Sequence, residues 1–277
     1  MASVTSLRLF YSNQYTSYNP QTSVEYFDSA LKVAFNLDPA ETANKYSDSV
    51  STMVNDSTKQ LSQEFITAQV DKVTSVQKAI TEKVQNDPLL WMRLAIDEMN
   101  KALLHGEDVD NSRYAINKAL ALAPKRVELL QLIIQLDGFK KDWAEAVTVT
   151  QKIIELSPQN TQARWQLAMA YYLNGQTELA VKAGDEAIAQ GMTFNKLQQF
   201  AWYIQYYFED KKDYAKAAPL LEKAINLEPN ELGLYIDLAQ AYAKLGDFEK
   251  ARLLAQQVAQ TDPTQKAAMD AFIRSLP

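Results

Sequence analysis

The spacing of four prolines is the feature that most limits how this chain of 277 residues can fold. Pro124 and Pro158 lie 34 residues apart, and so do Pro229 and Pro263. The interval from Pro158 to Pro229 is 71 residues, which is two such units and three additional residues. Self-similarity at a period of about 20–50 residues is typical of repeat proteins, in which each unit packs on its neighbours.

Other positions keep the same register between the prolines. Each unit has a turn sequence near its middle, such as Gly246-Asp247-Phe248, and a small residue a few positions after the turn begins. The small residues are Ser112, Ala146, Ala180, Ala217 and Ala251. The register defines five units, which are 93–126, 127–160, 161–194, 198–231 and 232–265.

Each unit is predicted to form two helices joined by a turn. In the last unit, Tyr235, Leu238 and Tyr242 recur at helical spacing and form one apolar face. Gly246 ends this helix, and Asp247 can cap the next one by accepting hydrogen bonds from its first N–H groups. Ala251 then allows the two helices to approach closely, where a larger side chain would hold them apart.

This pattern resembles the tetratricopeptide repeat, with a Trp/Tyr-x-x-Leu-Gly/Ala-x-x-Tyr first helix and a second helix that carries small residues and is followed by proline. Unit 232–265 matches nearly throughout, and unit 161–194 has Met192 in place of the proline. The other three units depart at the small position of the first helix, where Asn100, Ile134 and Gln205 stand. The resemblance implies an all-α fold, a right-handed α-solenoid of helix-turn-helix repeats, that serves protein–protein interaction.

Composition and charge agree with this interpretation. Seven glycines and nine prolines are few for this length, which favours helices with short links over a sandwich or barrel. The net charge is −6, and no run of Lys and Arg exceeds two residues, so nucleic acid is not the expected partner. No apolar run is long enough to span a bilayer, so we expect no membrane insertion by this chain.

The two ends of the chain are interpreted separately. Residues 1–92 are predicted to form an N-terminal helical region, with a possible divergent repeat at 8–41, a link at 42–59 and a long helix at 59–85. Residues 266–277 are predicted to form a helix that caps the last repeat, because the terminal repeat of a solenoid needs a polar outer face.

The sequence contains little that suggests catalysis. It has no cysteine and a single histidine, His105, predicted near the end of a helix, where a positive charge is favourable. None of the glycine-rich phosphate-binding, nucleophile-elbow or zinc-protease motifs is present. We therefore predict a chain that is not an enzyme and binds neither a metal nor a cofactor.

The resemblance also implies a binding surface, because the second, fifth, ninth and twelfth residues of a tetratricopeptide unit face the concave groove. Aromatic and amide side chains gather at these positions in the central units. The candidate partner-binding residues are Gln131, Gln135, Trp165, Met169, Tyr172, Trp202, Tyr206 and Gln240. Alternatively, these rings pack against the neighbouring helix and contribute only to the core.

The type of partner follows from the same positions. Chaperone-binding members of the family hold a C-terminal carboxylate with Lys and Asn at the fifth and ninth positions, and that clamp is absent here. Aromatic rings dominate interface energetics, so the expected partner is a protein or peptide with apolar or aromatic anchors. A glycan also suits an aromatic groove with amides, though less well, and a homodimer is a third hypothesis.

A second interpretation concerns the whole gene product. The segments 7–11 and 23–27, followed by repeats, are loosely similar to the C-terminal extracytoplasmic region of bacterial O-antigen ligase-like membrane enzymes. This resemblance implies a soluble domain that recruits or positions an acceptor outside the cytoplasm. A free-standing scaffold would instead be expected in the cytoplasm.

The repeat register predicts the effect of a substitution at the helix–helix contact. Ala251→Trp should overpack the last repeat and lower its stability by about 1–3 kcal/mol, measured as a lower melting temperature by circular dichroism. An unchanged melting curve would contradict the register.

Overall fold

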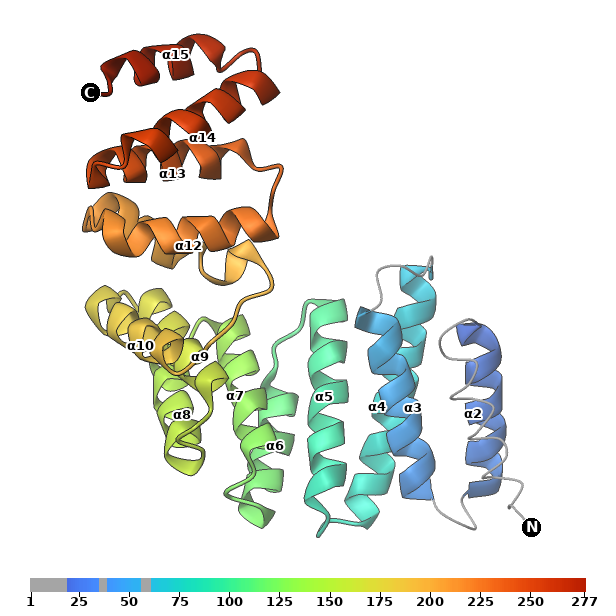
Figure 1. Cartoon of the computed structure of the whole chain (residues 1–277). Coiled ribbons are helices and arrows are strands. Elements are labelled where there is room, and N and C mark those ends of the chain that lie inside the picture. Colours follow the sequence, from blue (N-terminus) through green and yellow to red (C-terminus); the bar gives the residue numbers. More distant parts are fainter. Residues whose placement is uncertain (1–18, 35–38, 56–60) are drawn as a thin grey trace. The chain divides into compact units, whose positions relative to one another are not determined.

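The structure is a computed structural model, and it describes residues 19–34, 39–55 and 61–277 (Figure 1). Every regular element in these ranges is a helix, and none is a strand, which confirms the predicted all-α class. The chain divides into two compact units, Met1–Gln176 and Thr177–Pro277, and each is described by itself. None of the described helices combines the length and hydropathy needed to cross a membrane.

The first unit is a row of helices in which most pack on their sequence neighbours; α5, α6 and α7 lie side by side in Figure 1. The helices are α2 (Pro20–Ala34), α3 (Pro39–Asn55), α4 (Gln63–Lys83), α5 (Pro88–His105), α6 (Asp110–Leu122), α7 (Val127–Lys140), α8 (Trp143–Leu156) and α9 (Thr161–Leu173).

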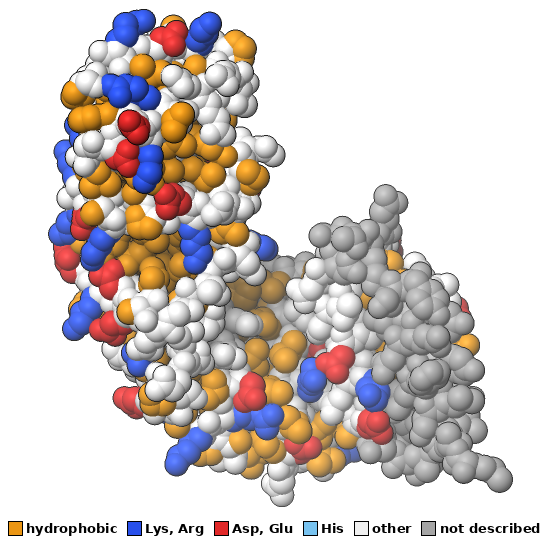
Figure 2. Space-filling model, in the orientation of Figure 1, with side chains coloured by type: hydrophobic (Ala, Val, Ile, Leu, Met, Phe, Trp, Pro, Cys, Tyr) orange, Lys and Arg blue, Asp and Glu red, His pale blue; other side chains and the backbone are white. Residues whose placement is uncertain are grey.

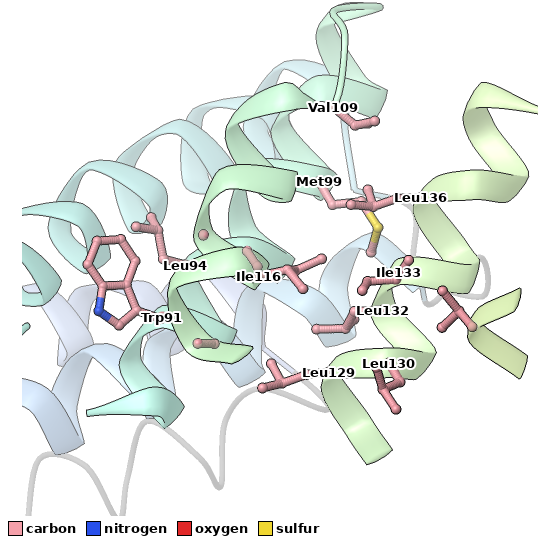
Figure 3. Close-up of a cluster of buried hydrophobic side chains, with 14 of the residues drawn as sticks. Trp91, Leu94, Met99, Val109, Ile116, Leu129, Leu130, Leu132, Ile133 and Leu136 are labelled. Atoms are coloured by element: carbon pink, nitrogen blue, oxygen red, sulfur yellow. The ribbon is translucent and has the colours of Figure 1, made fainter. Parts of the chain in front are cut away.

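The core of the first unit lies mainly between α5, α6 and α7. Figure 3 shows side chains from these helices meeting in one cluster, among them Leu94, Met99, Ile116, Leu129 and Leu136. Leu129 and Ile116 are fully buried. On α7, for example, the cluster members Leu129, Leu132, Ile133 and Leu136 recur at helical spacing and share one face. Burial of that face stabilises the packing of α7 on its neighbours.

The prediction of a link at 42–59 is wrong, because α3 occupies Pro39–Asn55. Ala43, Tyr46, Val50 and Met53 are buried and recur at spacings of three and four, which is the apolar face of a helix. The serine and threonine residues around them form hydrogen bonds: Thr52 Oγ1 donates to the carbonyl of Asp48, at 2.9 Å. Their hydroxyl groups are therefore compatible with the helix.

Two further N-terminal predictions, the repeat at 8–41 and the helix at 59–85, are compared with α2 and α4. The first part of the candidate repeat 8–41 lies outside the described residues, and the remainder contains α2. The helix predicted at 59–85 is shorter, since α4 begins at Gln63 and ends at Lys83. Ser62 caps it by accepting a hydrogen bond from the N–H of Phe65, at 3.2 Å.

The second unit contains the remaining helices. They are α10 (Thr177–Ala189), the 3₁₀ turn η1 (Leu197–Gln199), α11 (Ala201–Gln205), the π-helical turn η2 (Tyr206–Asp210), α12 (Tyr214–Leu227), α13 (Leu232–Leu245), α14 (Phe248–Thr261) and α15 (Lys266–Ser275). From α12 onward each helix packs on the next, and α15 contributes the buried Met269 to a cluster with Tyr235 and Val258.

The small residue at the start of the second helix is buried in all five repeats. The exposed fraction is at most 1% for Ser112, Ala146, Ala180, Ala217 and Ala251. Ser112 also donates a hydrogen bond to the carbonyl of Ala95 on the preceding helix, at 2.7 Å. A side chain larger than serine at these positions would require the two helices to separate.

The turns between paired helices share one geometry. Lys141, Gly175, Lys212 and Gly246 stand at equivalent positions and have positive φ values of 54–81°. Glycine adopts this conformation freely, whereas a lysine there is strained by about 1 kcal/mol. After the turn, Asp142, Asp213 and Asp247 cap the next helix, each accepting a hydrogen bond from the N–H three residues later.

Asp97 on α5 carries a buried carboxyl group. It is 1% exposed, and its Oδ1 accepts a hydrogen bond from the hydroxyl of Ser47 on α3, at 2.7 Å. Its other oxygen has no hydrogen-bond partner among the residues that the structure describes. Burial raises the pKa of Asp97 to about 7, against the opposing effects of the Ser47 hydroxyl and the Arg93 charge. The folded protein therefore binds a proton here that the unfolded chain releases near pH 4.

This raised pKa predicts a pH-dependent effect of substitution. Folding binds the proton between about pH 4 and pH 7, so the contribution of Asp97 to stability is lost as the pH rises through that range. The stability of wild type relative to Asp97→Asn should therefore fall by on the order of 4 kcal/mol between pH 4 and pH 8, measured by urea unfolding.

The control for this measurement is Glu155→Gln, which changes an exposed carboxylate to an amide in the same way. Its stability relative to wild type should be the same at both pH values. An equally flat difference for Asp97→Asn would show that folding does not raise the pKa of Asp97.

Candidate functional site

The eight predicted partner-binding residues fall into two sets, one in each compact unit. The first unit holds Gln131 and Gln135 on α7 and Trp165, Met169 and Tyr172 on α9. Gln135 and Tyr172 are exposed, Gln131 and Met169 are partly buried, and Trp165 is only 3% exposed.

The second unit holds the other three. Gln240 on α13 is exposed, whereas Trp202 on α11 and Tyr206 on η2 are 8% and 6% exposed. Replacing a buried tryptophan by alanine costs about 3–5 kcal/mol, so loss of binding in such a variant would not by itself locate an interface. That these eight residues bind a partner stays a prediction.

The helix that carries Trp202 and Tyr206 is irregular. The three residues 195–197 are additional to the 34-residue unit, and the segment from Leu197 to Asp210 forms η1, α11 and η2 instead of one continuous α-helix. In η2 the N–H of Lys211 donates to the carbonyl of Tyr206, five residues earlier, at 2.9 Å. Such π-helical turns often lie at functional sites, which directs attention to the side chains around it.

Asp185 on α10 organises the tyrosines of this segment. Its carboxylate accepts hydrogen bonds from the hydroxyl groups of Tyr203 and Tyr207; those from Tyr207 measure 2.7 and 2.9 Å. The ammonium group of Lys216 on α12 donates to the same carboxylate, at 3.1 Å, and to the Tyr207 oxygen, at 3.0 Å. One carboxylate thus ties α10 to α11, η2 and α12.

The ionisation of these groups follows from their contacts. Partial burial raises the pKa of Asp185, but the hydrogen bonds from Tyr203, Tyr207 and Lys216 outweigh it and leave the pKa below its usual value. Burial, and then the hydrogen bond to Asp185, raise the pKa of Tyr203. Hydrogen bonds to Tyr207 and Asp185 raise the pKa of Lys216. At neutral pH the cluster is therefore a carboxylate, two neutral phenols and an ammonium.

A second set of contacts lies beside the first. The Tyr206 hydroxyl and the Lys211 ammonium donate to the two oxygens of Glu178, at 3.2 and 2.8 Å, and Lys211 also lies 5.5 Å from the Tyr206 ring centroid. The side chain of Glu178 is 77% exposed, so solvent weakens this ion pair.

Two adjoining pockets flank the Asp185 cluster. The polar pocket, of about 590 Å³, is lined by charged residues and by Tyr206 and Tyr207. The apolar pocket, of about 420 Å³, lies between α10 and α12, and it shares Asp185, Tyr207 and Lys216 with the polar one. Its other lining residues are Ile188, Phe194, Tyr203, Ala215, Pro219, Leu220 and Lys223. Sequence reasoning found Tyr206 but missed Asp185, Phe194 and Tyr207.

The contacts of Asp185 limit its use as a base. The lining residues of both pockets include no serine, threonine, cysteine or histidine, and Asp185 already accepts from three donors, so it is a poor general base. Over the residues that the structure describes, His, Cys, Asp and Glu form no cluster of three that could hold a metal ion. His105, at the end of α5, lies 2.9 Å from Asp71 Oδ1.

The visible surface likewise carries no large patch of one charge. Figure 2 shows Lys and Arg side chains interspersed with Asp and Glu and with hydrophobic side chains. Several cations of the second unit are paired, including Lys211 with Glu178 and Lys250 with Asp247. This face offers neutral, apolar contacts bordered by charge, which suits a protein partner better than nucleic acid.

Paired helices with a small residue at each contact define an all-α protein of the solenoid class. Comparison with known families identifies the repeat: two family models, both described as tetratricopeptide repeat, match residues 140–193 and 209–276. These two segments carry tetratricopeptide repeats, as predicted.

A curated relative and two solved structures agree with this result. Superkiller protein 3 of Schizosaccharomyces pombe is 27% identical over 116 residues, which are 40% of this chain but 8% of that protein. A tetratricopeptide repeat protein from Parabacteroides merdae has a TM-score of 0.57 and 12% identity, with 98% of this chain and 97% of that chain covered. YrrB, described as a TPR protein with an unusual peptide-binding site, has a TM-score of 0.50 and 15% identity, with coverages of 70% and 96%. At these identities the two structures show the fold alone.

The Asp185 cluster predicts a specific loss of stability. Asp185→Asn removes the negative charge to which two phenols and one ammonium group donate. It should lower the free energy of unfolding by about 1–3 kcal/mol, measured by thermal unfolding. Glu178→Gln is the matched control: its carboxylate also accepts from a tyrosine and a lysine but is exposed, so this variant should melt close to wild type. Equal losses of stability in the two variants would show that Asp185 stabilises the fold no more than an exposed carboxylate does.

Proposed function

We propose that this chain is a protein-interaction scaffold that binds an extended segment or a helix of a partner along the first helices of its repeats. The observation that carries the proposal is the repeat itself. Two segments match tetratricopeptide models, and the helix pair α5 and α6 precedes the first of them. In each unit the first helices of the repeats present a surface to a partner.

The chemistry of the partner follows from the exposed members of the predicted surface. In the first unit, Tyr172 is 37% exposed and Met169 is partly exposed on α9, while Gln135 and Gln131 lie on α7. A ring and a thioether supply apolar contact, and the amides can both donate to and accept from the main chain of a peptide. A segment with aromatic or aliphatic anchors fits this surface best.

The comparisons support a peptide partner only by analogy. The peptide-binding site in the description of YrrB belongs to that protein, and its likeness to this chain is one of fold. The alternative of an O-antigen ligase-like membrane enzyme rests on segments 7–11 and 23–27. The first of these lies outside the described residues, and the second is part of α2. A glycan ligand and a homodimer are further outcomes that the experiment below distinguishes.

The proposal is tested with a random peptide library displayed on phage and selected on the purified chain. Selected sequences should be rich in aromatic and aliphatic residues and should bind wild type measurably by calorimetry. The double variant Gln135→Ala/Tyr172→Ala should bind a selected peptide about tenfold more weakly, a loss of about 1.4 kcal/mol, because it removes a hydrogen-bonding amide and an aromatic contact.

Leu253→Ala is the matched control, because Leu253 is a 66% exposed apolar residue on α14, a second helix. It should leave peptide affinity within a factor of two. Failure to enrich any peptide, or equal affinity of the double variant and wild type, would contradict the proposal. Glycan binding in an array or self-association in sedimentation would indicate which alternative applies.

A further inference from the structure

We infer that the apolar pocket between α10 and α12 is a second binding site, and that it takes a leucine or phenylalanine side chain of a partner segment that carries a carboxylate beside that anchor. The site goes beyond the proposed function, because α10 and α12 are second helices of their repeats and the predicted groove lies along the first helices. Four features of the second unit support this site.

The first observation is the size and lining of the pocket. Its volume of about 420 Å³ lies within the range of about 300–1,000 Å³ of pockets that bind ligands. Ile188 from α10 and Pro219 and Leu220 from α12 form aliphatic walls, and the rings of Phe194 and Tyr203 complete the enclosure. Pro219 is exposed, and Ile188 and Leu220 are partly exposed, so the apolar surface is open to an incoming side chain.

The second observation is that the aromatic wall is fixed before any partner arrives. Phe194 stacks on the fully buried Phe200, with ring centroids 4.6 Å apart and planes inclined by 17°. Tyr203 is held by its hydrogen bond to Asp185 and packs edge-to-face on Tyr207, at 5.0 Å. A preformed wall binds with little loss of side-chain entropy, so more of the contact energy appears as affinity.

The third observation is a main-chain acceptor at the pocket. Pro219 lies inside α12 and has no N–H, so the carbonyl of Ala215, four residues earlier, lacks its usual helical donor. Both residues line the apolar pocket. A main-chain N–H of a partner segment can supply the missing hydrogen bond while its side chain enters the pocket.

The fourth observation is the charge at the rim. Lys216 and Lys223 both line the pocket, about 10 Å apart along α12. Lys216 is paired with Asp185, whereas Lys223 lies 4.8 Å from the Phe194 ring centroid and forms no ion pair with a carboxylate among the described residues. Because Asp185 already accepts from three donors, the charge left without a counterion is positive and lies at the Lys223 end.

These features together define the occupant. The apolar anchor lies between the two lysines, against Pro219 and Leu220, and its neighbouring carboxylate pairs with Lys223. A partner with lysine or arginine beside the anchor would be repelled at that end. The pocket therefore selects an acidic neighbour as well as an apolar side chain.

The test uses the full chain and three eight-residue peptides with blocked ends, which contain Phe-Glu, Phe-Lys or Ala-Glu between glycine and serine residues. Binding is followed by two-dimensional amide NMR. The Phe-Glu peptide should shift the resonances of Phe194, Tyr207, Leu220 and Lys223. The Phe-Lys and Ala-Glu peptides should bind at least fivefold more weakly, because each lacks one of the two required groups.

Two variants separate recognition from folding. Lys223→Glu should reverse the preference, so that the Phe-Lys peptide binds more tightly than Phe-Glu, while Lys152→Glu, an exposed charge reversal on α8 in the first unit, should not. Pro219→Ala restores the helical hydrogen bond and removes part of the wall. It should therefore raise the melting temperature and weaken Phe-Glu binding several-fold.

The inference is overturned if the Phe-Glu peptide leaves the pocket resonances unchanged at millimolar concentration, or if Lys223→Glu keeps the wild-type preference. Shifts confined to α7, α9 and α13 would support the first-helix surface and contradict a site in the pocket. A dimer in sedimentation that Lys223→Glu dissociates would assign the pocket to a second copy of the chain and likewise contradict the inference.

Discussion

The close contact of two helices at one small residue is the constraint on which the rest of the structure depends. Ser112, Ala146, Ala180, Ala217 and Ala251 are all buried to at least 99%. With almost no side chain between them, the paired backbones approach closely, which fixes where the turn and the capping aspartate must lie. Lysines at positive φ in two of the four equivalent turns show that this turn geometry is kept even where the residue is unfavourable.

The Asp185 cluster and the apolar pocket arise where the repeat is irregular. Three additional residues precede the fourth repeat, a π-helical turn interrupts its first helix, and a single carboxylate on α10 then holds the tyrosines of this segment. A regular helix at this place would present a different set of side chains to α10. Local irregularity that specific hydrogen bonds maintain is characteristic of functional positions.

Sequence alone predicted much of the fold, because the information is local. Helix ends at Gly246, caps such as Asp247 and the small residues all act within one repeat. The failures have physical causes. The many Ser, Thr, Asp and Asn residues between 42 and 59 indicate a link, whereas α3 is a helix in which Ser47 donates to Asp97, 50 residues later, a partner that local sequence does not reveal. Asp185 was missed because its partners are 18–31 residues away and meet it only after the irregular segment is placed.

The burial of the predicted binding residues shows the same limit of prediction from sequence. Family positions placed Trp165, Trp202 and Tyr206 on a binding groove, yet all three are less than 9% exposed. A position number in a repeat gives the side of the helix but not how far a large ring turns towards its neighbours. The predicted surface therefore rests on its exposed members, which are Gln135 and Tyr172 in the first unit and Gln240 in the second.

The most direct test of the central claim is hydrogen exchange of the wild-type chain, resolved by peptide and measured at increasing denaturant. If paired helices depend on their shared contact, α13 and α14 should open together, as should α5 and α6, and the two pairs should have different free energies of opening. Exchange of α13 while α14 stays protected, or one global opening for every helix, would contradict the account.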